Sequence, residues 1–300
     1  MTIASFLNIL LGLLLAPLLL GIVNRTKAVF AGRTGQPLLQ AYYDIVKQLR
    51  KGAVYSNTAS WVFRAGPIVG FAAVLTALCI VPLGGVAAPL AFSGDLLLFA
   101  YLLGAMRFFT VIAALDTGSS FEGMGASREV LYSALAEPAL LIGLAAVARE
   151  TGSLSLSTLL PAAHVFSPEV VLVVVALLVV YLCENARIPF DDPNTHLELT
   201  MIHEVMVLDH SGPDFAFILY GAALKLWVLG LLIVGIVFPA PADLFRPLSV
   251  GTAVAGLLGL AVVVGVIEST MARLRLIRIP QLLVAAGSLS AFAFLLVLRS

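Results

Sequence analysis

Four ionisable side chains stand out because they lie inside long apolar runs of the sequence. They are Arg107, Glu137, Lys225 and Glu268. A charge at the centre of a bilayer costs at least ~2.5 kcal/mol, so each of these residues needs a partner or water. The set therefore forms either structural ion pairs between helices or part of a path for protons or ions.

Glu137 has the strongest case for proton chemistry, because Pro138 follows it directly. A proline removes a backbone donor and frees the carbonyl of Ala134, which opens the helix where the acid sits. Burial favours the neutral form of a carboxyl, which suits a group that takes up and releases a proton. Lys225 is a counter-charge or a relay member, and Glu268 is near enough to Arg273 or Arg275 for a structural pair.

The composition places these charges in a polytopic membrane protein. Of the 300 residues, 61% are hydrophobic and 11% are charged, and the mean hydropathy is +1.07. Soluble domains contain about 45–50% apolar and about 25% charged residues. Seventeen basic residues balance seventeen acidic ones, so no net basic field attracts nucleic acid.

The sequence predicts an all-α protein with a single integral membrane domain over residues 1–300. A spanning helix needs about 20 mostly apolar residues. Eight runs satisfy this requirement: 3–23, 62–82, 96–115, 130–148, 168–187, 215–238, 250–271 and 282–298. No basic residue precedes the first run, which indicates a retained helix rather than a cleaved signal peptide.

The basic residues predict the orientation of the chain. The segments after spans one, three, five and seven hold Arg25, Lys27, Arg33, Lys47, Arg50, Lys51, Arg128, Arg187, Arg273, Arg275 and Arg278. The opposite side holds Arg149, Arg246 and Arg299. Positive residues stay inside, so both termini are expected on the outer face of the cell membrane.

Residues 35–51 (GQPLLQAYYDIVKQLRK) predict an amphipathic helix on the inner side. Leucines and tyrosines gather near one helical face, and charged and amide side chains occupy the rest. We expect this helix to lie along the membrane interface or against a partner.

Residues 188–214 form an acidic inner loop, predicted to be partly helical over 195–208. Its carboxylates are Asp191, Asp192, Glu198, Glu204, Asp209 and Asp214. Because this charge opposes the usual bias, the loop is expected to face another protein or a water-filled cavity. On a continuous helix His196, His203 and His210 would share one face, but residues two turns apart are ~10 Å distant, too far for one metal ion. We expect these histidines to titrate near neutral pH or to form hydrogen bonds at an interface. Just before the loop, Glu184 and Arg187 are three residues apart and can pair on a helix end.

Several chemistries find no support in the sequence. Cys79 and Cys183 stand far apart without a C-x-x-C pair, so no iron–sulfur cluster or thiolate zinc site is expected in this chain. No P-loop, G-x-G-x-x-G motif or internal repeat is found. We therefore expect no catalytic residue, metal or cofactor of the chain's own.

Three local sequences resemble the complex I subunit 1 family: GRTGQPLLQAYYDIVKQLRKG, ENARIPFDDPNTHLELTMIHEV and MARLRLIRIPQLL. Two further passages, RFFTVIAALDTGSSFEGMGASREV and HLELTMIHEVMVLDHSGPD, resemble the branch of energy-converting group 4 [NiFe]-hydrogenases, the formate hydrogenlyase subunit 4 family. The likeness covers essentially the whole chain.

The resemblance implies a subunit that anchors a peripheral arm, in which large and small subunits carry the [NiFe] centre and iron–sulfur clusters. It also implies antiporter-like membrane neighbours and a link between redox chemistry and proton or sodium movement. Together with the charges inside the apolar runs, the expected coupling residues are Glu137, Lys225, Glu198, Glu204, Glu268 and Arg107. The implied docking residues are Arg33, Gln36, Asp44, Lys47, Asp191, Asp192 and Arg187.

Three alternatives remain at this level. A quinone-site subunit of a complex I-like dehydrogenase is disfavoured because the sixth span carries Lys225 where quinone-reducing relatives keep an acid. A pure anchor would use the charges as structural pairs only. A free-standing transporter is disfavoured by the absence of a repeat and by the acidic inner loop.

Overall fold

The computed structural model describes residues 3–163, 167–192, 201–240 and 246–299. All named elements in these ranges are helical. They are α1 (Ile3–Phe30), α2 (Gln40–Leu49), α3 (Trp61–Leu78), α4 (Asp95–Asp116), α5 (Ser120–Thr151), α6 (Leu156–Ala162), α7 (Pro168–Glu184), η1 (Glu204–Val207), α8 (Gly212–Val237), α9 (Arg246–Thr270), η2 (Leu276–Arg278) and α10 (Ile279–Arg299).

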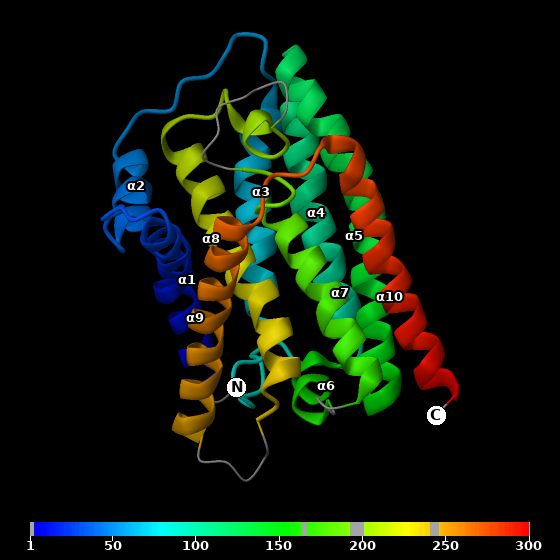
Figure 1. The fold of residues 1–300 in the computed structure, drawn as a ribbon. Helices are drawn as coiled ribbons and strands as arrows, with labels where there is room; N and C mark the ends of the chain where they lie inside the picture. The colour runs from blue at the N-terminus through cyan, green and yellow to red at the C-terminus, as the bar shows by residue number, and fades with distance from the viewer. Residues whose placement is uncertain (1–2, 164–166, 193–200, 241–245, 300) are drawn as a thin grey trace.

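The long helices form one bundle in which neighbours along the chain are often neighbours in space. α3 packs on α4, α5 packs on α10 and α7, and α1 packs on α9. The two ends of the chain lie at the same end of the bundle, and the connection carrying α2 lies at the other (Figure 1). The predicted placement of both termini outside the cell stays a prediction.

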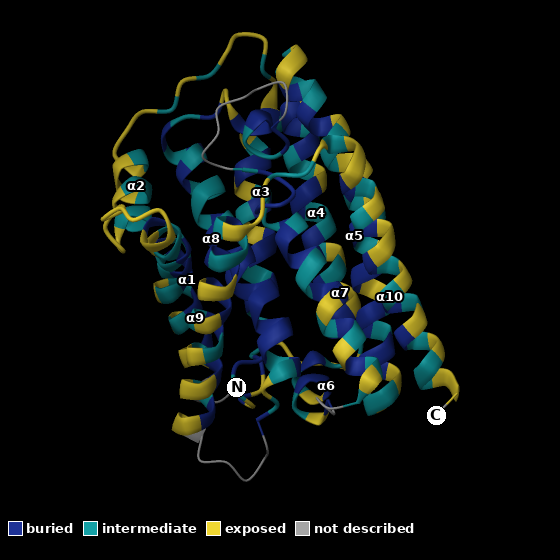
Figure 2. Ribbon diagram, in the orientation of Figure 1, coloured by how far each residue is buried: buried dark blue, intermediate teal, exposed yellow. Residues whose placement is uncertain are grey.

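α8 is the central column of the bundle. In the most apolar stretch of α8, 72% of the residues are buried. The corresponding stretches of α9 and α10 are 28% and 22% buried. Figure 2 shows the same contrast between the dark core and the exposed outer faces. Glycines allow this close packing, because a Cβ on Gly230 would lie 2.8 Å from the Leu257 Cδ2 atom of α9.

Seven helices in the described residues are long and apolar enough to cross a membrane. They correspond to all the predicted spans except 168–187, whose helix α7 has 17 residues. The all-α membrane architecture is therefore confirmed, whereas the count of eight spans stays a prediction. Two helices run further than expected: α1 continues to Phe30, and α5 begins at Ser120 rather than at residue 130.

α7 ends inside the bundle instead of running to residue 187. The chain after Glu184 turns away through Ala186, which has a positive φ of 49°. Residues 187–191 are irregular yet buried. Irregular backbone is tolerated at membrane depth where protein covers it. The Leu274 amide, from the stretch of chain that joins α9 to α10, donates to the Pro189 carbonyl at 2.9 Å.

The predicted helix over residues 195–208 is wrong in its described part. Residues 201–203 are not helical, and only a short 3₁₀ helix, η1, follows. His203 precedes η1 and His210 lies beyond it, so they do not share a helical face. His196 falls outside the described residues. The chain follows buried contacts here, because Val205 and Met206 pack into the bundle next to α5.

The predicted amphipathic segment contains a helix, α2, with no buried residue. It packs beside α1 and α8 and leaves Tyr43, Val46 and Leu49 exposed. Its position along a membrane interface stays a prediction.

Candidate functional site

Arg107 of α4 is the centre of a cluster of charges inside the bundle. Its Nε donates to Glu129 Oε1 at 3.2 Å, and its two terminal nitrogens donate to Glu137 and Glu184. Glu129 and Glu137 come from α5, and Glu184 is the last residue of α7. One guanidinium therefore joins three helices through three carboxylates.

Two more residues extend this cluster. Lys225 Nζ of α8 lies 3.0 Å from Glu184 Oε2. His203 Nδ1 lies 3.9 Å from Glu129 Oε2. We call Arg107, Glu129, Glu137, Glu184 and Lys225 the central ion network. Three carboxylates face two cations, so the network lacks one positive charge when all its members are ionised and His203 is neutral.

The network is buried at its centre and exposed at one end. The side chains of Arg107 and Lys225 are 8% exposed and that of Glu184 is 4% exposed. The side chain of Glu137, by contrast, is 47% exposed. The acid thus reaches the surface of this chain part-way along a spanning helix, where a carboxylate facing lipid alone would be costly.

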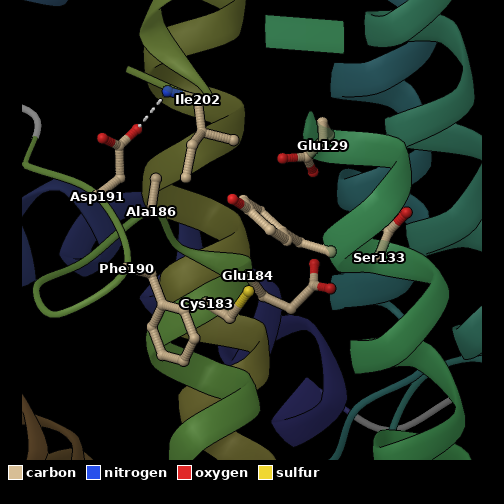
Figure 3. A pocket seen from close by; sticks show the side chains of 9 residues that line it. Glu129, Ser133, Cys183, Glu184, Ala186, Phe190, Asp191 and Ile202 are labelled. Atoms are coloured by element: carbon tan, nitrogen blue, oxygen red, sulfur yellow. Dashed lines mark hydrogen bonds between the residues drawn. The ribbon is translucent and has the colours of Figure 1, made fainter. Parts of the chain in front are cut away.

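A small cavity of about 10 Å³ lies beside the network. In Figure 3 Glu129 and Glu184 stand on one side of it, Asp191 and Phe190 stand on the other, and Cys183 lies between. The cavity has room for about one water molecule, and polar groups line it. A single water there would connect carboxylates that come from different segments.

Glu268 forms a second junction that is separate from the central ion network. Its Oε2 lies 2.8 Å from Lys27 Nζ of α1, and its Oε1 accepts from Arg187 at 3.5 Å. The sequence predicts that Glu268 pairs with Arg273 or Arg275, but in the structure it pairs with Lys27 and Arg187. Its side chain is fully buried, so the junction fastens α9 to α1 and to the chain beyond α7.

Asp191 holds the acidic loop in place. One of its oxygens accepts from the Ile202 and His203 amides at 3.0 and 3.2 Å. The other lies 2.9 Å from Arg273 Nη2. Buried carboxylates are stable when every oxygen is hydrogen-bonded, and Asp191 meets this condition within the chain itself.

The structure brings together three of the predicted coupling residues, Arg107, Glu137 and Lys225, and leaves Glu268 apart. Glu204 begins η1 and is half-buried. Glu198 lies outside the described residues. None of these placements tests a coupling role, which stays a prediction.

Glu129 was not expected in the site, and Glu184 was expected to have a different partner. Glu129 lies one residue before the apolar run 130–148, so hydropathy assigns it to the connecting segment. The signal that could have found it is its spacing of eight residues from Glu137, which puts both acids within about 80° on a helix. Glu184 was expected to pair with Arg187, but the helix ends between them and each finds another partner.

The predicted docking residues divide into two groups. Arg33, Gln36 and Lys47 are exposed around α2, and Asp44 accepts from the Gln40 side chain at 2.9 Å. Three others lie near the end of α7 and the acidic loop, where Arg187 and Asp191 are buried and Asp192 is half-buried. Arg187 and Asp191 could contact a partner only after rearrangement of this chain, because both are buried.

No metal site is found in the part of the chain that the structure describes. There, no three His, Cys, Asp or Glu side chains converge closely enough to hold an ion. Cys79 and Cys183 are free thiols. The carboxylates of the central ion network are already engaged by basic side chains.

Comparison with known proteins places this geometry in a family. The model of the family described as NADH dehydrogenase matches residues 3–298. Formate hydrogenlyase subunit 4 of Escherichia coli (strain K12) is 33% identical over 294 residues, covering 95% of both chains. Hydrogenase-4 component C of the same organism is 33% identical over 230 residues, covering 76% of this chain and 72% of that protein.

More distant relatives agree in fold. A subunit of the NADH-quinone oxidoreductase of Anaplasma phagocytophilum (strain HZ) is 27% identical over 201 residues, which cover 61% of this chain and 58% of that protein. A chain in the solved structure of the membrane-bound sulfane sulfur reductase, an archaeal respiratory membrane complex, superposes with a TM-score of 0.83 at 21% identity. The alignment covers 97% of this chain and all of that chain. The protein described here therefore belongs to the NADH dehydrogenase family of membrane proteins, the family of complex I subunit 1.

Proposed function

We propose that this chain is the membrane-anchoring and ion-coupling subunit of a multi-subunit [NiFe]-hydrogenase complex of the formate hydrogenlyase type. In this proposal partner subunits carry the [NiFe] centre and the iron–sulfur clusters. The chain docks that arm and links its electron transfer to proton or sodium movement. The names of the two relatives at 33% identity, a hydrogenlyase subunit and a hydrogenase component, support the choice of complex.

The observation that carries the coupling proposal is the central ion network. Five ionisable side chains from four helices meet where the surroundings are apolar. Each would cost ~2.5 kcal/mol or more if it stood alone in the bilayer. Hydrophobic residues of similar volume would hold four helices together at least as well, so anchoring alone does not account for so many charges.

The composition of the network explains how it could hold a mobile charge. Arg107 and Lys225 both bind Glu184, so their hold on that carboxylate changes with the charge of the other acids. One added proton on an acid brings three carboxylates and two cations to neutrality. A network that is one positive charge short is therefore suited to take up a proton or another small cation and to release it.

The docking part of the proposal rests on exposed side chains at one end of the bundle. Arg33, Gln36 and Lys47 lie at or near α2 and are open to a partner. Residues 187–192, which follow α7, lie toward the same end of the bundle (Figure 1), and Asp191 anchors them to residues 202 and 203. A soluble arm seated there would be close to the loop, and through the loop to the central ion network.

A quinone site is the second candidate, because two relatives in the same family are named as subunits of an NADH-quinone oxidoreductase. A cavity between α3, α4 and α8 has aromatic and polar walls, including Phe71, Phe217 and Thr110. Its volume is about 20 Å³. That is room for about one water molecule rather than for a quinone ring, which disfavours this candidate.

The test compares Glu137→Gln with Glu169→Gln in the complex that co-purifies with the tagged subunit. Glu169 is a half-buried acid in the first turn of α7, outside the central ion network, and serves as the matched control. In liposomes, Glu137→Gln should keep hydrogen turnover with an artificial donor but lose most proton movement per electron. Glu169→Gln should retain both.

Two results would contradict the proposal. Wild-type proton movement in Glu137→Gln would remove this acid from the coupling path. A co-purified complex that contains no nickel but reduces quinone would replace the hydrogenase assignment by the dehydrogenase one.

A further inference from the structure

Two histidines line the same cavity but differ in what surrounds them. The cavity of about 20 Å³ between α3, α4 and α8 is bordered by His203 and His210. Only His203 also borders the central ion network, through Glu129. The two rings therefore differ in their contact with the charges of the network.

His210 is held as a neutral ring. It stacks on Phe63 of α3, with 3.9 Å between the ring centroids and 9° between the planes, and it is 7% exposed. Burial lowers the pKa of His210 to about 4, because a charged imidazolium would lose its hydration. At neutral pH this ring is therefore uncharged.

His203 is held at the edge of the network by its backbone. Its amide donates to Asp191 Oδ2 at 3.2 Å, and Arg128 Nη1 donates to the nearby Met201 carbonyl at 2.9 Å. These two bonds fix residues 201–203 against α5 and against the irregular chain that follows α7. The imidazole itself is 23% exposed, so it has access to water that the centre of the network lacks.

The charged groups around the His203 ring favour a proton relay. Glu129 of α5 faces it, and Arg107 of α4 binds the other oxygen of Glu129. The neutral His210 lies on the wall of the same cavity, and Asp191 engages the His203 amide rather than the ring. The ring therefore meets the oxygen of Glu129 that Arg107 leaves open.

We propose that His203 is the residue through which protons enter the central ion network. This inference rests on the coupling function proposed above. A proton from water in the cavity adds to Nε2, and the proton on Nδ1 then passes to Glu129 Oε2. The ring ends neutral and Glu129 ends as a carboxylic acid. The 3.9 Å between Nδ1 and Oε2 closes by a small rotation or by one bridging water.

Protonation of Glu129 would change the network in a defined way. The acid that gains the proton binds Arg107 less strongly, since a neutral carboxyl attracts a cation less than a carboxylate does. Arg107 keeps its bonds to Glu137 and Glu184. The positive charge of the added proton is then distributed over the central ion network. The network extends to Lys225 on one side and to the exposed carboxylate of Glu137 on the other.

The experiment uses the purified complex in liposomes and measures protons moved per electron transferred. His203→Gln should lower this ratio about tenfold or more, because an amide side chain can neither accept the proton nor pass it to Glu129. His210→Gln is the matched control from the same cavity and should leave the ratio near the wild-type value. Redox turnover of the peripheral arm with an artificial donor should persist in both variants.

Chemical rescue separates proton transfer from a structural role. His203→Gly should regain proton movement when imidazole is added to the medium, with a rescue that follows the concentration of the imidazole. A variant that has only lost packing would not respond. Wild-type proton movement in His203→Gln, or loss without rescue in His203→Gly, overturns the proposal.

The outcome also distinguishes this inference from the proposed function. If His203→Gln is normal while Glu137→Gln is uncoupled, the network couples and protons enter by another residue. If both variants move protons normally, the coupling function itself fails.

Discussion

Arg107 of α4 and Glu184 of α7 form an ion pair at the residue where α7 ends. The carboxyl end of a helix carries the negative pole of its dipole, so a glutamate is unfavourable there. Arg107 and Lys225 offset both the side-chain charge and the helix terminus. The early end of α7 thus places a negative centre inside the bundle, and basic side chains from two other helices hold it.

Removal of Arg107 should destabilise the protein more than removal of any exposed arginine. Arg107→Met would leave three carboxylates facing Lys225 alone, and breaking a buried ion pair costs about 3–5 kcal/mol. Arg64→Met, which loses an exposed cation–π contact of 4.4 Å with Tyr55, should cost about 1 kcal/mol or less. Unfolding in detergent measures both.

The double variant Arg107→Met/Glu184→Gln should be more stable than Arg107→Met, because it removes one of the uncompensated acids. An additive loss in the double variant would show that the two residues are not coupled.

Packing of η1 against α5 should depend on Gly125. A Cβ at this position would overlap Val205 Cγ1 and lie 2.9 Å from Met206 Cγ. Gly125→Ala should therefore displace η1, destabilise the chain by about 1–3 kcal/mol and expose residues 201–207 to hydrogen exchange. Gly123→Ala, two residues earlier on the same helix, meets no atom within 4 Å and should not destabilise. Equal protection of residues 201–207 in the two variants would contradict the prediction.

Stability should fall as the pH is lowered through the range in which His210 titrates. An unfolded histidine binds its proton below about pH 6.5, whereas folded His210 does so only near its pKa of about 4. The unfolded state therefore binds more protons between these values, and stability rises with pH across this window. The loss on acidification is up to ~3 kcal/mol and is complete below both pKa values.

Denaturant unfolding at pH 4.5 and pH 7 measures this effect. His210→Phe keeps an aromatic ring beside Phe63 and removes the titrating group, so its stability should change less between the two pH values. Equal pH dependence in the wild type and the variant would show that His210 is not the group responsible.

Hydropathy predicts most of this fold because a bilayer imposes one length on every spanning helix. Seven of the expected runs are long apolar helices in the structure. The predictions are wrong at the ends of some helices, because an apolar run does not always end at the same residue as the helix that contains it. α5 extends from residue 130 back to Ser120 through polar residues that lie beneath η1, and α7 stops at Glu184 although leucines and valines precede it.

The sequence identifies Arg107, Glu137 and Lys225 as charges of the site, but it reveals neither Glu129 nor the way the charges pair. Helical spacing predicts a pair between Glu184 and Arg187, and proximity in the chain predicts one between Glu268 and Arg273 or Arg275. In the structure Arg187 and Lys27 bind Glu268, and Arg273 binds Asp191. These pairs depend on which helices pack together and on how the chain turns after α7. Neither is encoded in local spacing.

The order of the helices bears on how the protein is made. Arg107 and two of its three acids lie on consecutive helices, α4 and α5, which only residues 117–119 separate. Released alone into lipid, α4 would carry an unpaired arginine at a cost of ~2.5–3.5 kcal/mol. Released together with α5, it arrives already matched with Glu129 and Glu137. The helical hairpin is then the smallest piece of this chain that the translocon can deliver with that arginine neutralised.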